Sequence, residues 1–94
     1  MKCEQPDWDK LLTDCKEIIE KKFKDYGNSW IELKPNHHFW MQRLEGEFNE
    51  WARSRHTGEP EEIQKELCDI INVCAMIYTN LEKEKQSELA SLFG

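Results

Sequence analysis

The sequence predicts an all-α protein, a helical bundle in a single domain over residues 1–94. Apolar residues recur at spacings of three and four in three long segments, which is typical of amphipathic helices. Glycine and proline fall between those segments, where they favour turns. No segment alternates apolar and polar residues as a half-buried strand does. Because the chain has 94 residues, it can form one domain with a modest core.

The first predicted helix covers residues 7–26. Asp7 follows Pro6 and is a suitable N-cap, and Gly27 with Asn28 is expected to end the helix. Its apolar positions are Trp8, Leu11, Leu12, Cys15, Ile18, Ile19 and Phe23.

The second predicted helix runs from about His37 to Arg55 after a connection over residues 27–36. Pro35 disfavours helix just before it, and Asn36 is a suitable cap. The apolar positions are Trp40, Met41, Leu44, Phe48 and Trp51. The sequence HTGEP at 56–60 then predicts a short break, with Pro60 in the first turn of the next helix.

The third predicted helix runs from about Pro60 to Lys83. Its apolar stripe consists of Ile63, Leu67, Ile70, Cys74, Ile77 and Leu81. Steps of four and three along this stripe are typical of a bundle seam. Residues 84–94 either extend this helix or form a short fourth helix.

The net charge and the aromatic content of the chain limit the kinds of partner that it can bind. The net charge is −6, from 19 acidic and 13 basic residues, so binding to a polynucleotide or an anionic membrane is not expected. Four Trp, four Phe and two Tyr are a generous aromatic content for 94 residues. They favour either an apolar surface covered by a partner chain or an open ligand pocket.

The sequence also predicts a cytoplasmic protein. No run of 18 apolar residues is present, and the first ten residues lack the apolar core of a signal peptide. The four cysteines form no C-x-x-C pair. We therefore expect reduced, mostly buried thiols in the cytosol.

Two acidic pairs, Glu47-x-x-Glu50 and Glu66-x-x-Asp69, lie in the second and third predicted helices. At 100° per residue, Glu47 falls about 60° and Glu50 about 120° from the apolar stripe centred on Leu44. Glu66 and Asp69 have the same offsets, about 60° and about 120°, from their own stripe. Since the short break makes these helices antiparallel, both pairs are expected on one shared rim.

Four carboxylates on one rim require positive charge. Two like charges about 4 Å apart repel by roughly 4 kcal/mol at an effective dielectric of about 20. Mg²⁺ and Mn²⁺ prefer such hard oxygen ligands, so the residues favour a carboxylate metal site. The alternative is an ordinary solvated flank, since acidic residues are frequent here and Arg43, one turn before Glu47, can pair with it.

Beyond these pairs, the order of motifs resembles the MazG-like all-α nucleoside triphosphate pyrophosphohydrolases. The segment FKDYGNSW at 23–30 precedes the first pair, and the second pair lies in ELCDIINV at 66–73. Residues 51–65, 15 in number, separate the pairs. The resemblance covers about residues 20–82. One departure is Gly46, which stands where the family carries a further glutamate.

The resemblance implies Mg²⁺-dependent hydrolysis of NTPs or dNTPs to the monophosphate and pyrophosphate, in a house-cleaning or nucleotide-pool role. It implies that Glu47, Glu50, Glu66 and Asp69 hold Mg²⁺, with Mn²⁺ as a substitute. Glu47 or Glu50 would be the general base. It also implies a homodimer or homotetramer, in which helices from different chains form a four-helix bundle.

Further candidates for substrate contacts are Trp30, Lys24, Arg43, Lys65 and Asn72. Trp30 could stack on a base or simply close its loop. Lys24, Arg43 and Lys65 could contact phosphate oxygens, and Asn72 lies one turn beyond Asp69.

A helical bundle with these acidic pairs has two alternative functions. A non-catalytic helical oligomerisation or interaction module would carry the same acidic flanks without binding a metal. A di-iron bundle of the ferritin type ranks last because it requires Glu-x-x-His pairs, and neither Glu47 nor Glu66 has a histidine at the third following position.

Overall fold

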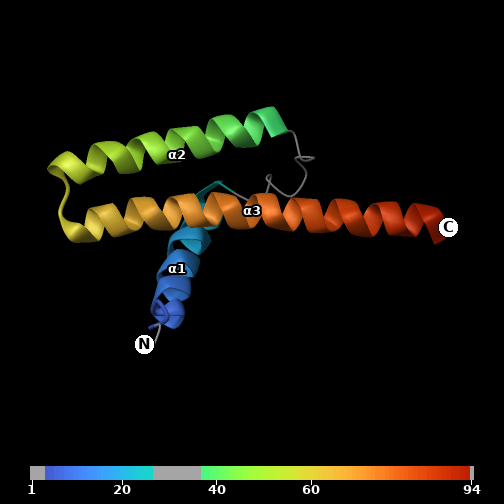
Figure 1. Ribbon diagram of the computed structural model, residues 1–94, viewed down its shortest axis with the longest axis horizontal. Coiled ribbons are helices and arrows are strands. Elements are labelled where there is room, and N and C mark those ends of the chain that lie inside the picture. Colours follow the sequence, from blue (N-terminus) through green and yellow to red (C-terminus); the bar gives the residue numbers. More distant parts are fainter. Residues whose placement is uncertain (1–3, 27–36, 94) are drawn as a thin grey trace.

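The computed structural model describes residues 4–26 and 37–93. In chain order its helices are α1 (Trp8–Tyr26), α2 (His37–Thr57) and α3 (Pro60–Phe93) (Figure 1). The predicted all-α class is confirmed. Helix α2 continues two residues past the predicted end, and α3 continues well past Lys83. Residues 84–93 therefore extend the third helix, and the alternative of a fourth helix is wrong.

Helix α1 begins with the predicted cap. The backbone N–H of Lys10 donates to Oδ1 of Asp7 at 3.1 Å, and the N–H of Leu11 donates to the Asp7 carbonyl at 3.0 Å. These two bonds satisfy donors that a helix N-terminus otherwise leaves free. The predicted stop at Gly27–Asn28 and the predicted cap Asn36 lie outside the described residues.

Helices α2 and α3 form an antiparallel hairpin, in which Gly58 and Glu59 are the connection. The Gly58 N–H donates to the Ser54 carbonyl at 2.7 Å, and the Glu59 carbonyl accepts from the N–H groups of Glu62 and Ile63 at 3.0 and 3.1 Å. A connection this short leaves no room for another arrangement, so α2 lies beside the first part of α3 (Figure 1).

Helix α1 packs across α3 near the middle of its length (Figure 1). Cys15 and Cys68 are buried, and the Asn72 side-chain amide donates to the Cys15 carbonyl at 3.0 Å. Burial, and next a hydrogen bond with Cys68, raises the pKa of the Cys15 thiol to about 12. The thiol is therefore neutral at pH 7 and packs as a small apolar group.

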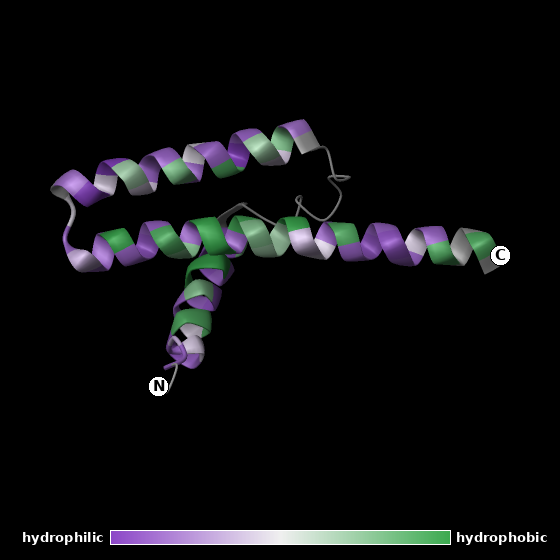
Figure 2. Ribbon diagram, in the orientation of Figure 1, coloured by the Kyte–Doolittle hydropathy of each residue, from purple (hydrophilic) through white to green (hydrophobic). Residues whose placement is uncertain are grey.

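The apolar stripes predicted on α2 and α3 are only partly covered. In α3, Leu67 and Leu81 are 39% and 38% exposed, and hydrophobic residues continue on the part of α3 that extends past α2 (Figure 2). In α2, Phe48 is 54% exposed, whereas Trp40 and Glu47 are buried. The helices are therefore rotated, relative to the prediction, toward their acidic shoulders.

The long dimension of the molecule is that of α3. Its 34 residues correspond to about 51 Å of α-helix at the usual rise, and the longest principal extent is 52 Å. Despite this length, none of the described helices is both long and apolar enough to cross a membrane.

Alanine substitutions at the two described glycines of the hairpin should change the free energy of unfolding in opposite directions. A Cβ at Gly46 would meet nothing within 4 Å, whereas a Cβ at Gly58 would lie 2.7 Å from the Ser54 carbonyl oxygen. We expect Gly46→Ala to raise the free energy of unfolding by roughly 0.5–1 kcal/mol, because alanine restricts the unfolded chain. We expect Gly58→Ala to lower it by about 1–2 kcal/mol. Urea unfolding measures both, and equal effects of the two substitutions would contradict the described turn.

Candidate metal centre

Four carboxylates from α2 and α3 converge at the hairpin interface. The acidic cluster consists of Glu47, Glu50, Glu66 and Asp69, and one oxygen from each residue lies within 4.8 Å of the other three. Residues three apart on a helix lie on neighbouring turns of the same face, so each helix presents two carboxylates together. The antiparallel pairing then brings the two pairs opposite each other, as the sequence predicted.

The acidic cluster is graded from buried to exposed. Glu47 and Asp69 are 7% and 3% exposed, Glu66 is half-buried, and Glu50 is exposed. Oε2 of Glu47 and Oε2 of Glu66 are buried, and neither accepts a hydrogen bond from the described residues. A buried carboxylate oxygen without a partner is costly, so a cation bound at these two oxygens would stabilise the fold.

The electrostatics of the cluster oppose its ionisation. Burial raises the pKa of Glu47, and the carboxylates of Asp69 and Glu50 raise it further. Burial also raises the pKa of Glu66, again with contributions from Asp69 and Glu50. Nearby cations oppose these shifts. Both residues therefore bind their protons more tightly than free glutamate does, as expected for like charges gathered in a poorly solvated place.

Each helix supplies one cation to the cluster. From α1, Lys22 Nζ lies 2.9 Å from Oδ1 of Asp69. From α2, an Arg43 guanidinium nitrogen lies 3.7 Å from Oε1 of Glu47. From α3, Lys65 Nζ lies 3.7 Å from Oδ2 of Asp69. With four carboxylates and three cations, all ionised, the local charge is −1.

The donor set fits a hard divalent cation. All four groups offer carboxylate oxygens, the ligands that Mg²⁺ and Mn²⁺ prefer. Opposite ligands of an octahedral Mg²⁺ are about 4.2 Å apart, twice the Mg–O distance, and the cluster oxygens already lie within 4.8 Å of one another. The unpartnered oxygens of Glu47 and Glu66 lie in the same cluster. The residues present therefore fit such an ion.

The remaining predicted site residues divide into four groups. Arg43 and Lys65 lie at the cluster, as ion-pair partners of its carboxylates. The amide nitrogen of Asn72 is engaged with the Cys15 carbonyl, so Asn72 ties α1 to α3, which the sequence did not predict. Lys24 is exposed and lies about 200° around α1 from Lys22, so it faces away from the cluster. Trp30 lies outside the described residues.

The sequence analysis missed Lys22. It lies seven residues after Cys15, two helical turns along the same face, and Cys15 is buried against α3. A lysine placed on the apolar face of an amphipathic helix was the signal that could have identified it. Lys22 is accordingly half-buried, whereas Lys21 and Lys24 are exposed.

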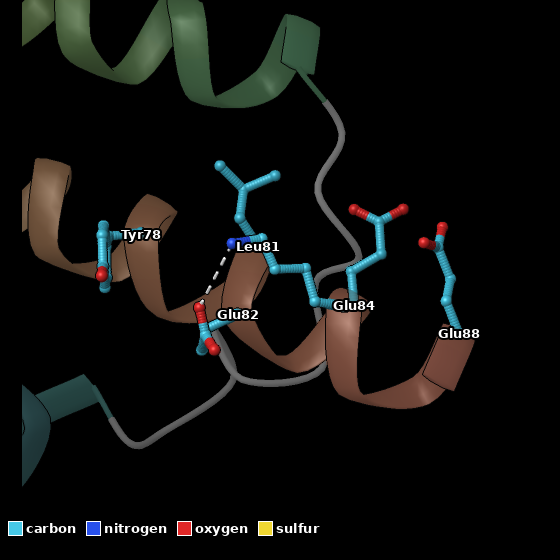
Figure 3. A pocket seen from close by; sticks show the side chains of 6 residues that line it. Tyr78, Leu81, Glu82, Glu84 and Glu88 are labelled. Atoms are coloured by element: carbon cyan, nitrogen blue, oxygen red, sulfur yellow. Dashed lines mark ion pairs between the residues drawn. The ribbon is translucent and has the colours of Figure 1, made fainter. Parts of the chain in front are cut away.

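A hollow lies on the C-terminal half of α3, away from the acidic cluster, and is less suited to chemistry. Tyr78, Leu81 and several charged residues line it (Figure 3). Glu82 pairs with Lys85 at 3.7 Å, and the carboxylates of Glu84 and Glu88 point outward (Figure 3). These groups do not converge, so the acidic cluster is the candidate site.

Glu47 should oppose folding in the absence of metal. Because the pKa of Glu47 is raised above its ordinary 4.5, its contribution to stability is complete below pH 4.5 and is lost as the pH rises through the raised value. We expect Glu47→Gln to raise the free energy of unfolding at pH 7 in metal-free buffer and to have less effect near pH 4. Urea unfolding at both values measures this.

The same substitution should abolish stabilisation by metal. Mn²⁺ at a hundred times its dissociation constant should stabilise the unsubstituted protein by about 2.7 kcal/mol and should not stabilise Glu47→Gln. Glu45→Gln is the matched control, since Glu45 is exposed on the same helix outside the cluster. Identical behaviour of the two variants would contradict the proposed metal centre.

Comparisons with known proteins add no relative. A scan against protein-family models, a search of curated proteins and a search of solved structures each found no match. The MazG-like resemblance therefore stays a prediction that depends on the motifs of this chain.

Proposed function

We propose that this protein is a Mg²⁺-dependent nucleoside triphosphate pyrophosphohydrolase, which converts NTPs or dNTPs to the monophosphate and pyrophosphate. The observation that carries the proposal is the convergence of four carboxylates from two helices, within 4.8 Å of one another. Two of their oxygens are buried and have no hydrogen-bond partner within residues 4–26 and 37–93. The MazG-like order of motifs supplies the reaction class.

In this proposal Glu47, Glu50, Glu66 and Asp69 hold Mg²⁺, and Mn²⁺ can replace it. When bound, the cation would supply the positive charge that attracts a triphosphate and would lower the pKa of a water molecule. Two rigid helices fix the four side chains before the substrate arrives. Such preorganisation is what positioning and electrostatic catalysis require.

Glu50 is the better placed of the two candidate bases. Glu50 is exposed and Glu47 is buried, so a water that arrives from solvent meets the Glu50 carboxylate first. In the proposed reaction a Glu50 oxygen takes a proton from the attacking water, whose oxygen bonds to the α-phosphorus. The bond from that phosphorus to the bridging oxygen breaks, and pyrophosphate leaves with the electron pair.

The cations at the edge of the cluster suit a polyphosphate. Arg43 and Lys65 are 51% and 57% exposed and pair only loosely, at 3.7 Å, with the cluster. Either side chain can turn to a phosphate oxygen while its stem stays in place. This placement explains how a protein of net charge −6 could bind a polyanion. A base contact through Trp30 and a phosphate contact through Lys24 stay predictions.

We also propose a cytoplasmic location. Cys15, Cys68 and Cys74 are free thiols, as expected in the reducing cytosol.

A panel of NTPs and dNTPs tests the reaction. We expect monophosphate plus pyrophosphate in the presence of Mg²⁺ and no turnover after chelation. Glu66→Gln should lower kcat/KM on the order of 100-fold or more, since even the outer neighbours of metal ligands cost 10–100-fold. Glu61→Gln, exposed on the same helix, is the control and should keep full activity.

Two outcomes of the panel would count against the proposal. Release of orthophosphate in place of pyrophosphate would exclude attack at the α-phosphorus. Absence of turnover for every nucleotide, together with absence of metal binding, would favour the second candidate function, a non-catalytic oligomerisation module.

Specific observations favour self-association under either function. Met41 and Phe48 are 59% and 54% exposed, and no large side chain among the described residues is fully buried. The radius of gyration is 16.1 Å, compared with about 12 Å for a compact domain of this length. We therefore propose that the apolar surface of α2 packs against another copy of the chain, as a homodimer or homotetramer.

A charge placed on this surface should separate the copies. We expect Phe48→Glu to convert the oligomer to a monomer of 11.3 kDa, because a carboxylate would have to be buried without a partner in the interface. Gln42→Glu, at an exposed polar position of α2, should leave the oligomer intact. Size-exclusion chromatography with light scattering measures both. A monomeric unsubstituted protein at tens of micromolar would refute the interface.

A further inference from the structure

We propose that the Lys22 ammonium group is an internal counter-ion, which stands beside Asp69 in the metal-free protein and is displaced when the divalent cation binds. The inference concerns the metal centre of the proposed function and depends on it. It assigns Lys22 a role in setting metal affinity, as a cation that competes with the metal ion for Asp69.

The geometry distinguishes Lys22 from the other cations. Its Nζ lies 2.9 Å from Oδ1 of Asp69, a hydrogen-bonding distance, whereas the contact of Lys65 with Oδ2 is 3.7 Å. Lys65 reaches Asp69 from its own helix, but Lys22 is 47 residues away in sequence and comes from α1. The Asp69 side chain is 4% exposed and that of Lys22 is 39% exposed. Lys22 is thus the cation that enters the buried end of the cluster from another helix.

A lysine ammonium and a divalent cation compete for the same oxygen. The ammonium has three donors and no acceptor, so it binds carboxylates through the lone pairs that a metal would use. A metal ion at 2.0–2.1 Å from an Asp69 oxygen would repel an ammonium at hydrogen-bonding distance from that carboxylate. A divalent ion held by the four carboxylates would carry twice the charge of the ammonium, so it should prevail over Lys22.

The Lys22 side chain can move into solvent when it is displaced. Lys22 is 39% exposed, and its stem has four flexible carbons, so the ammonium can leave the cluster for solvent without a change in α1. Released from Asp69, it would remain at the edge of the site, where it would attract a polyphosphate.

The two possible roles of Lys22 predict opposite changes in Mn²⁺ affinity when the lysine is removed. If Lys22 competes with the metal, Lys22→Met should tighten Mn²⁺ binding on the order of fivefold, in line with a partly exposed ion pair. If Lys22 only orients Asp69, the same substitution should weaken binding. Lys21→Met, exposed on the neighbouring position, is the matched control, and Lys22→Arg restores the charge and should return the affinity toward that of the unsubstituted protein.

Titration calorimetry with MnCl₂ on the full chain measures these affinities, and circular dichroism verifies that each variant is helical. We also expect Lys22→Met to melt at a lower temperature than Lys21→Met in metal-free buffer, because Asp69 loses its closest cation, and to gain more from saturating Mn²⁺. Both readouts are independent of activity.

The outcomes separate this inference from the proposed function. Tighter binding by Lys22→Met than by Lys21→Met supports displacement. Equal or weaker binding by Lys22→Met, while the unsubstituted protein binds Mn²⁺ through Glu66, overturns the inference and leaves the metal centre standing. Absence of Mn²⁺ binding in every variant overturns both.

Discussion

The structure depends on one constraint, the need to bring positive charge to four carboxylates gathered at a helix interface. Glu47 and Asp69 are almost fully buried, where water cannot stabilise their charge. Lys22, Arg43 and Lys65 each come from a different helix and offset most of the charge. Among the residues that the structure describes, Oε2 of Glu47 and of Glu66 still have no hydrogen-bond partner. A cluster that keeps a net negative charge and two buried oxygens without partners costs stability, and its four carboxylates could hold a divalent cation.

The three helices contribute to this cluster in different ways. The two-residue connection at Gly58 and Glu59 fixes the alignment of α2 against α3, and this alignment decides which acidic pair faces which. Helix α1 lies across α3, where the bond from Asn72 to the Cys15 carbonyl holds it. That position lets the Lys22 side chain reach Asp69. Helix α1 thus contributes one cation to a cluster formed by the other two helices.

Placing carboxylates in the hairpin interface has a cost in stability. Positions that would otherwise bury apolar side chains hold Glu47 and Asp69, and apolar residues such as Phe48 and Leu67 are left partly exposed. Functional sites commonly break the rules of stable packing in this way, and the rest of the fold compensates. A second chain packed against the exposed apolar surface would supply the missing burial, which joins the proposed site to the proposed oligomer.

The sequence by itself determined the all-α class, the three helices to within two residues except at the end of α3, the Asp7 cap and the convergence of the acidic cluster. These follow from local spacing, since a helical wheel fixes which residues of one helix share a face. The wheel does not fix how far a helix is rotated toward its neighbour, so the sequence placed Glu47 and Asp69 on a shoulder where the tertiary structure buries them. Only tertiary structure brought Lys22 to Asp69 and gave Asn72 its partner on α1. Both contacts join residues dozens of positions apart. The pattern of α1 could place Lys22 on the packed face, but only the packing between helices decided which residue it meets.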